Sequence, residues 1–318
     1  MGIDKHNQQY MTIHDFHHHS HIGWDNSLVP IAEIDSGQVV TFEIVDSSGG
    51  QFTKNSTAAD IKDLDFNKVN PTVGPIYIKG AEPGDTLEVE FLDFRQLEWG
   101  WTAIIPGFGL LADDFKDPAL KVYDLSHRHK AEFLHGIDLF IKPFPGTVGV
   151  ALPEPGHFNV IPPRKNGGNM DIRHLTKGTK LYLPVWVEGA LFSIGDTHAA
   201  QGDGEVCGSA IEAGMETTVR FKLHKGKTIP EPRYEIPGPP TPEADSLGYF
   251  VTTGHGEDIY QASQNAIRYM IEHLVQEYKM NAEEAYMLCS VTVDLRISEI
   301  VNAPNKLVSA FLPKAIFK

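Results

Sequence analysis

The chain has 318 residues, of which 41% are hydrophobic, and a formal net charge of −15. Nucleic acids and anionic membranes bind basic surfaces, so this acidic composition excludes both as expected partners. Its two cysteines form no disulfide framework, the N-terminus lacks a signal-peptide core, and no apolar run reaches the about 18 residues of a membrane span. We therefore expect a cytoplasmic globular protein with a small, neutral or cationic substrate.

The N-terminal segment is rich in histidine. Chain termini are often mobile, so we expect residues 1–20 to form a solvated segment outside the fold. His21 differs from the others because Trp24-Asp-Asn-Ser-Leu and then a strand follow it at once, and it could supply a metal ligand. The histidines that lie within eight residues are His14, His17, His18, His19 and His21.

Residues 21–230 are predicted to form a mainly β body. Four segments, residues 36–44, 83–91, 177–185 and 213–221, each begin with a glycine turn and continue as an alternating strand. One apolar face per strand is typical of a sandwich or barrel, and we expect a β-sandwich or jelly-roll-like body. The apolar faces consist of Val40, Phe42 and Ile44 in the first segment and Leu87, Val89 and Phe91 in the second.

Two segments of this body are candidates for the wall of a pocket. Residues 98–111 join two tryptophans to a Pro-Gly-x-Gly turn, and Trp101 with Gly107 could bound an apolar pocket. Packing of the tryptophans in the core is the alternative. A short match to the signature of amidases with a serine nucleophile occurs at Asp46-Ser-Ser-Gly-Gly-Gln51, but the longer Gly-Ser context of that signature is missing. We interpret it as a turn, with Gln51 facing a site.

Residues 195–212 carry most of the reactive side chains. A strand that continues from Leu191 places Asp196 and His198 on one face because strand side chains alternate with a period of two. A turn at Gln201-Gly-Asp-Gly would make a hairpin and bring Glu205 back towards that pair. Such a group could hold a divalent metal or share acid and base roles, whereas the alternative is a hairpin whose residues serve turn geometry only.

The C-terminal quarter changes pattern. Six prolines between residues 229 and 244 predict an extended connector. Apolar residues at three- and four-residue steps then predict a helix over residues 257–278, and Asn281 with Glu284 resembles a capping box that starts a second helix through about Leu288. Strand alternation returns at residues 291–300. We expect residues 243–318 to form a smaller α+β unit.

The segment Gly195-Asp-Thr-His-Ala-Ala-Gln-Gly-Asp-Gly-Glu-Val-Cys-Gly resembles the signature of the acetamidase/formamidase family. Gly74-Pro-Ile-Tyr-Ile-Lys-Gly-Ala-Glu-Pro-Gly-Asp, Gly167-Gly-Asn-Met-Asp-Ile-Arg and other segments are similar to the same family, from about residue 21 to the C-terminus. The resemblance implies hydrolysis of short aliphatic amides, such as formamide or acetamide, to a carboxylate and ammonia. It also implies a β-sandwich-like body, a homo-oligomer and a bound divalent metal.

The chemistry of amide hydrolysis suggests a role for each of these residues. An amide is a poor electrophile, and zinc both lowers the pKa of bound water to about 7 and polarises the carbonyl. Our hypothesis is that Asp196 and His198 bind the metal with His21 as a third ligand, while Glu205 moves the proton. Asp203 would orient the histidine or join the metal. Manganese and calcium suit such ligands as well.

Two other interpretations stay open. The first is an amidase with Cys207 as its nucleophile. A neighbouring carboxylate disfavours the thiolate, so we interpret Cys207 as a packing residue first. The second is a non-catalytic β-sandwich module that binds a small ligand or ion.

Overall fold

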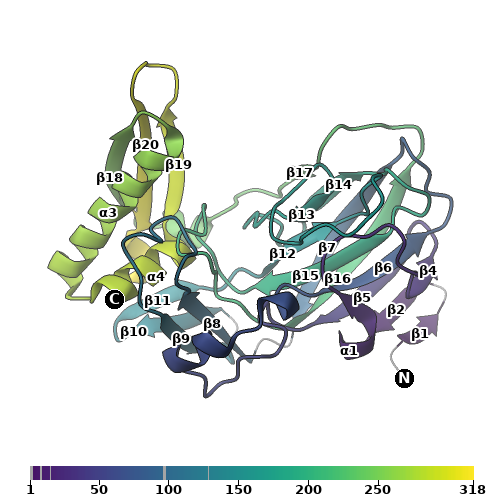
Figure 1. Cartoon of the computed structure of the whole chain (residues 1–318), viewed down its shortest axis with the longest axis horizontal. Coiled ribbons are helices and arrows are strands. Elements are labelled where there is room, and N and C mark those ends of the chain that lie inside the picture. Colours follow the sequence, from purple (N-terminus) through teal and green to yellow (C-terminus); the bar gives the residue numbers. More distant parts are fainter. Residues whose placement is uncertain (1–2, 8, 15, 96–97, 128) are drawn as a thin grey trace.

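A computed structural model describes residues 3–7, 9–14, 16–95, 98–127 and 129–318 of the chain. Two sheets stack to form a sandwich, and a smaller group of helices and strands from the C-terminal part stands beside it (Figure 1). This arrangement confirms the prediction of a mainly β protein. No helix in the described residues is long and apolar enough to cross a membrane.

The larger sheet has seven strands and contains all four of the strands that were predicted from glycine turns. Those four are β5, β7, β14 and β16, and they pair antiparallel with one another, while β2 joins β5 in parallel. In spatial order the strands are β1 (Ile3–Asn7), β2 (Tyr10–Ile13), β5 (Val39–Ile44), β16 (Met215–His224), β7 (Thr86–Arg95), β14 (Lys180–Pro184) and β17 (Arg233–Glu235).

The second sheet carries the strand on which the predicted site lies, β15. That strand pairs antiparallel with β12 on one side and β6 on the other, so it is held in the interior of the sheet. In spatial order the strands are β13 (Gly167–Asn169), β12 (Phe144–Gly149), β15 (Phe192–His198), β6 (Thr72–Ile78) and β3 (Ser20–His21), and β4 (Ala32–Ile34) also pairs with β6.

The two sheets enclose one hydrophobic core. Phe221 of the larger sheet meets Phe192 of the second sheet edge-to-face, with ring centroids 4.9 Å apart. The predicted faces of β5 and β7 point into this core, where Phe42 and Val89 are completely buried. Fully burying such a side chain stabilises the fold by about 1.5–3 kcal/mol. Packing on both sides therefore keeps β15 in a fixed position.

The N-terminal segment corrects one prediction. Residues 1–20 were expected to lie outside the fold, but β2 joins the larger sheet and buries Met11 and Ile13. The alternation of these two apolar residues with Tyr10 and Thr12 gives β2 one face that fits the core. The rest of the segment contributes β1 and the short helix α1 (Phe16–His19), and the histidine cluster falls partly on residues whose side chains lie outside those described.

The C-terminal elements largely follow their predicted pattern. Helix α3 (Ile259–Tyr278) begins after Asp258, whose side chain accepts a hydrogen bond from the Gln261 amide, and it lies along one face of a three-stranded sheet (Figure 1). Helix α4 (Ala282–Thr292) has the predicted capping box and continues past the predicted end because its last residues are buried. The sheet order is β18 (Tyr249–Gly256), β20 (Lys306–Pro313) and β19 (Asp294–Glu299).

The remaining elements are short. Two hairpins, β8–β9 and β10–β11, lie between the sandwich and the C-terminal elements (Figure 1). The connector over residues 229–244 is mostly exposed and includes only β17 and α2. The bounds are β8 (Trp99–Ile104), β9 (Ala119–Asp124), β10 (Lys130–Leu134), β11 (Ile137–Phe140), α2 (Pro242–Asp245), and the 3-10 turns η1 (Ala58–Asp63), η2 (Phe66–Lys68) and η3 (Lys314–Ile316).

The stretch after β15 is a long loop in place of the tight hairpin that was predicted. A turn forms at residues 202–205, but the returning chain pairs with the end of β15 only at residues 211–213. β15 and β16 belong to different sheets, so residues 199–214 cross from one sheet to the other. Apolar residues of this loop, such as Val206 and Ile211, share a second core with α3, α4 and the two small hairpins. Burial in that core holds the loop away from the tight return that its Gly-Asp-Gly sequence favours.

The C-terminal elements support this loop through its backbone. The backbone carbonyl of Ser290 in α4 accepts a hydrogen bond from the Gly202 amide at 2.8 Å. The Ser290 side-chain hydroxyl accepts one from the Cys207 amide at 3.1 Å. The Leu295 amide of β19 donates to the Asp203 carbonyl at 3.0 Å. A Cβ on Gly202 would lie 2.1 Å from the Val293 carbonyl oxygen, so only glycine fits this contact.

Candidate metal centre and active site

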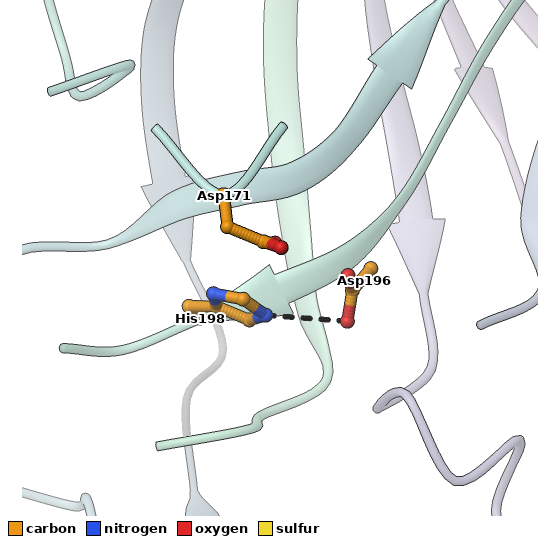
Figure 2. A group of neighbouring side chains, drawn as sticks. All are labelled: Asp171, Asp196 and His198. Carbon is orange, nitrogen blue, oxygen red and sulfur yellow. Dashed lines mark hydrogen bonds and ion pairs between the residues drawn. The ribbon is translucent and has the colours of Figure 1, made fainter. Parts of the chain in front are cut away.

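The site begins with two side chains from the end of β15. Asp196 and His198 lie on the same face, as predicted, with Asp196 Oδ1 3.2 Å from His198 Nε2 (Figure 2). Both are almost completely buried. Asp196 has a φ of 52°, a left-handed conformation that aspartate tolerates better than most residues. The strand is therefore distorted at the point where it presents the two groups.

A third side chain, Asp171, reaches the pair from the segment after β13. Its carboxylate points towards Asp196 and His198 (Figure 2), and ligand atoms of the three residues lie within 4.8 Å of one another. Asp171 Oδ1 is buried without a hydrogen-bond partner among the described residues. Gly146 of β12 leaves the space for this arrangement, because a Cβ there would lie 2.6 Å from Asp171 Oδ1 and 2.8 Å from Asp196 Oδ2.

Two glutamates of the long loop complete the group. Glu205 and Glu212 each place a carboxylate oxygen within 4.8 Å of a His198 nitrogen and of each other. The backbone of Glu212 bridges to His198, and its Oε2 lies 3.2 Å from His198 Nε2 but makes no well-formed hydrogen bond. Asp171, Asp196, His198, Glu205 and Glu212 are hereafter called the acidic cluster.

The close approach of these charged groups strongly shifts their pKa values. Burial on its own lowers the pKa of His198, but the Glu212 and Asp196 carboxylates outweigh it and raise the pKa well above its ordinary value. Burial, and then the neighbouring Asp196, raise the pKa of Asp171 to about 7. Burial and Asp171 also raise the pKa of Glu205 well above its usual range. Without a cation, Asp171, Asp196 and Glu205 therefore favour the protonated form, whereas His198 outweighs burial and lowers the pKa of Glu212.

Gln201 fixes the orientation of the imidazole. Its amide nitrogen donates to the Asp171 carbonyl at 2.9 Å, which leaves Oε1 to accept from His198 Nδ1, also at 2.9 Å. When a cation replaces the proton on Nε2, this bond keeps the remaining hydrogen on Nδ1 and leaves the Nε2 lone pair directed towards the carboxylates. Such a hydrogen bond selects the tautomer of a metal-binding histidine.

The acidic cluster opens into a pocket of about 450 Å³. Asp196, Glu205 and Glu212 line its inner part, together with polar residues such as Ser47 and Asn70. Nearer the surface the lining is apolar, and we call this part the apolar rim. The apolar rim comprises Leu64, Phe66, Ile105, Phe108, Ile161 and Pro163.

His21, the predicted third ligand, does not join the acidic cluster. Its Nδ1 donates to the Gly23 carbonyl at 2.8 Å, and its Nε2 lies 2.8 Å from the Ser193 hydroxyl. Neither group of potential metal ligands found among the described residues includes it. The short strand β3 pairs with β6, and this pairing holds His21 beside Thr72 instead.

The predicted pocket residues are only partly brought together. Trp101 lines the pocket, and its Nε1 donates to Asp46 Oδ1 at 2.9 Å. Gly107 does not line it; with a φ of 86°, it forms the turn that places Phe108 there. Gln51 also lies outside the lining, because its amide joins Ser48 to the Asp65 backbone.

The other predicted catalytic residues differ in position. Glu205 belongs to the acidic cluster, whereas Asp203 is outside the pocket lining and its backbone is tied to Asp294 and Leu295 of β19. Cys207 is buried with its Sγ 3.4 Å from the Ala103 carbonyl oxygen, and burial raises the pKa of its thiol to about 11. These contacts match the interpretation of Cys207 as a packing residue.

Sequence reasoning missed Asp171, Gln201 and Glu212 as functional residues. Asp171 precedes the strand pair by more than twenty residues, so no spacing rule connects it to them. Gln201 and Glu212 lie inside the reactive stretch, but the expected hairpin assigned Gln201 to a turn and gave Glu212 no role. Glu212 lies beside His198 because the far end of the loop returns and pairs antiparallel with the end of β15.

Comparisons with known proteins agree over almost the entire chain. A model of the Acetamidase/Formamidase family matches residues 6–157 and 155–318. A putative formamidase from Schizosaccharomyces pombe is 30% identical, over 91% of this chain and 88% of that protein. The formamidase of Methylophilus methylotrophus is 28% identical, over 94% of this chain and 89% of its own length.

Solved structures resemble the chain as well. A gamma lactamase from Delftia acidovorans has a TM-score of 0.87 at 26% sequence identity, with 94% of this chain and 90% of that chain covered. An acetamidase from Bacillus halodurans has a TM-score of 0.66 at 32% identity, with 95% and 96% covered.

Proposed function

The chain belongs to the acetamidase/formamidase family, and on that premise we propose that it hydrolyses short-chain amides to a carboxylate and ammonia at the acidic cluster. Formamide and acetamide are the substrates that the names of its relatives suggest. The observation that carries the assignment is a group of four carboxylates, two buried and two half-buried, around one buried histidine at the inner end of a pocket.

The acidic cluster fits a divalent cation. Asp171 Oδ1 is buried without a hydrogen-bond partner among the described residues, and Glu212 Oε2 has only the ion pair with His198 there. A buried oxygen in the state of Asp171 Oδ1 is costly unless a cation or water satisfies it. Asp171, Asp196 and His198 would hold the ion, and their carboxylate and imidazole ligands suit zinc, manganese or calcium. When bound, such an ion supplies Lewis acidity, polarising a carbonyl and lowering the pKa of water.

Glu205 is the residue that we assign to proton transfer. It belongs to the acidic cluster and lines the pocket, so it can reach both an attacking water molecule and the scissile amide. Burial and the nearby Asp171 raise the pKa of its carboxyl well above its usual range, and a carboxylate with a raised pKa is a stronger proton acceptor when it is ionised. Glu205 thus takes a proton from water and delivers it to the departing nitrogen.

Gln201 and the walls of the pocket prepare the site. Gln201 holds the His198 ring with Nε2 towards the carboxylates. Trp101, fixed by its bond to Asp46, forms one wall against which a planar amide can be positioned. Because a small amide offers few atoms for binding, such positioning contributes much of its orientation.

The surroundings of Cys207 disfavour the cysteine-nucleophile alternative. The thiol is buried outside the pocket lining, and the pKa of about 11 leaves very little thiolate at neutral pH. A binding module without catalysis gains no specific support, since the acidic cluster and the family both favour hydrolysis. The homo-oligomer stays a prediction.

Ammonia release tests this proposal. Purified protein is analysed for bound metal, and ammonia release from formamide and acetamide is measured before chelation, after chelation and after metal add-back. We expect activity to follow metal content, and the Cys207→Ala variant to remain active. Full activity in metal-free protein together with an inactive Cys207→Ala variant would establish the cysteine mechanism instead.

A further inference from the structure

The pocket is larger than the smallest amides require. Its volume of about 450 Å³ lies within the range of about 300–1,000 Å³ in which proteins enclose drug-sized ligands. A molecule such as acetamide bound at Glu205 and Asp196 would leave the outer part of this space filled with water. The outer part is where the apolar rim lies, so the unfilled volume is bounded by carbon atoms.

Separate segments of the chain build the apolar rim. Phe66 begins the 3-10 turn η2, whose cap is the Asp65 side chain, and Phe108 follows the turn at Gly107. The two rings stack with centroids 5.3 Å apart and an angle of 7° between their planes. Their exposed fractions are 46% and 42%, and Ile161 beside them is 38% exposed.

An exposed aromatic pair at the mouth of a pocket favours an apolar ligand group, because covering it removes carbon surface from water. The position of that group follows from the reaction class. A primary amide loses ammonia and has no substituent on nitrogen, so an apolar extension can only be attached at the acyl carbon. With the amide at the acidic cluster, an acyl chain would lead outward along Trp101 to the apolar rim.

We propose that the preferred substrates are primary amides whose acyl group carries an apolar extension, such as a linear alkyl chain or a benzyl group, covered by Phe66, Phe108 and Ile161. This inference rests on the proposed amidase function. Each methylene that leaves water on binding is worth about fourfold in kcat/KM. Hexanamide, with four more methylenes, should therefore exceed acetamide in kcat/KM by up to about 250-fold.

The experiment measures kcat/KM by ammonia release for formamide, acetamide, butanamide, hexanamide and phenylacetamide. The metal-loaded enzyme is compared with the Phe108→Ala and Phe66→Ala variants. The readout is the ratio of kcat/KM for hexanamide to that for acetamide, which we expect each variant to lower about tenfold by removing ring contacts. Tyr269→Ala is the matched control, because Tyr269 is an aromatic residue of α3 with a similar exposed fraction, 46%.

The outcomes separate this inference from the proposed function. Hydrolysis of acetamide with no rise along the series overturns the inference and leaves the amidase function intact, whereas no hydrolysis of any amide overturns both. Faster hydrolysis of N-butylacetamide, measured by release of acetate because it forms butylamine and no ammonia, than of hexanamide overturns the acyl placement. If Phe108→Ala keeps the ratio but dissociates an oligomer in analytical ultracentrifugation, the apolar rim is a contact between copies and the inference is wrong.

Discussion

Two histidines at β15 have opposite surroundings. His198 belongs to the strand and lies at the inner end of the pocket, whereas His21 lies beside the strand and contacts Ser193. His198 Nε2 faces two carboxylates, Asp196 and Glu212. His21 faces a hydroxyl and a backbone carbonyl. The pKa of His198 is accordingly raised well above its ordinary value, whereas burial lowers the pKa of His21 to about 4.

This contrast shows what distinguishes a potential metal ligand from a structural histidine. Both rings are well ordered by hydrogen bonds, so order alone does not decide. At the acidic cluster the negative charge exceeds what one imidazole can balance, and a bound cation would compensate the excess. Around His21 the partners are neutral, and a neutral ring connects β3 to β15 without any need for an ion.

Loss of Glu205, the proposed proton-transfer group, should have the largest effect. We expect Glu205→Gln to lower kcat for amide hydrolysis by about 10²- to 10⁴-fold, because the glutamine side chain cannot take up a proton from water. Bound metal should be retained, as measured by elemental analysis. Asp203→Asn is the control, since that side chain lies outside the pocket lining and we expect activity within about threefold of wild type. Inactivity of the control with an active Glu205→Gln would reverse the two roles.

Loss of a ligand comes next and separates the two histidine environments directly. Loss of a residue that only orients a metal ligand lowers metal affinity by about 10- to 100-fold. Asp171→Asn should weaken metal binding by at least as much, because it replaces a negatively charged ligand with a neutral one. Isothermal titration of metal-free protein measures the affinity. His21→Gln should bind metal as wild type does. A comparable loss in His21→Gln would make His21 a ligand.

Gln201→Ala should have a smaller effect on the same measurement. Without the Oε1 acceptor, the His198 ring is free to change tautomer, and we expect metal affinity to fall by about 10-fold. Gln201→Glu keeps an acceptor at that position and should recover part of the affinity. Equal affinity in wild type and Gln201→Ala would show that packing alone holds the ring.

The smallest effect concerns stability rather than activity. Between pH 6.5 and about 4 the unfolded chain protonates His21 while the folded chain does not, so the free energy of unfolding falls as the pH falls through this window. The loss at pH 4 is at most about 3 kcal/mol. Urea unfolding at several pH values should show a flatter dependence for His21→Gln. An unchanged slope would contradict the neutral environment described for His21.

The sequence predicted those parts of the fold and the site that depend on local pattern. The alternation in β5 and β7, the capping box of α4 and the shared face of Asp196 and His198 all follow from neighbouring residues. Asp171 and Glu212 depend instead on how β13 and the long loop are placed by two separate cores. The Gly-Asp-Gly sequence favours a hairpin locally, and burial of Val206 and Ile211 overrides it.

The support of residues 199–214 by α4 and β19 has a consequence for the order of events during synthesis. Every strand of the sandwich precedes residue 236 in the chain, whereas Ser290 and Leu295 emerge from the ribosome later. Both sheets can therefore pair while the loop still lacks the partners of its Gly202 and Asp203 backbone. We therefore expect the sandwich to fold before Ser290 and Leu295 fix the loop that carries Glu205, so that the acidic cluster is completed after the sheets.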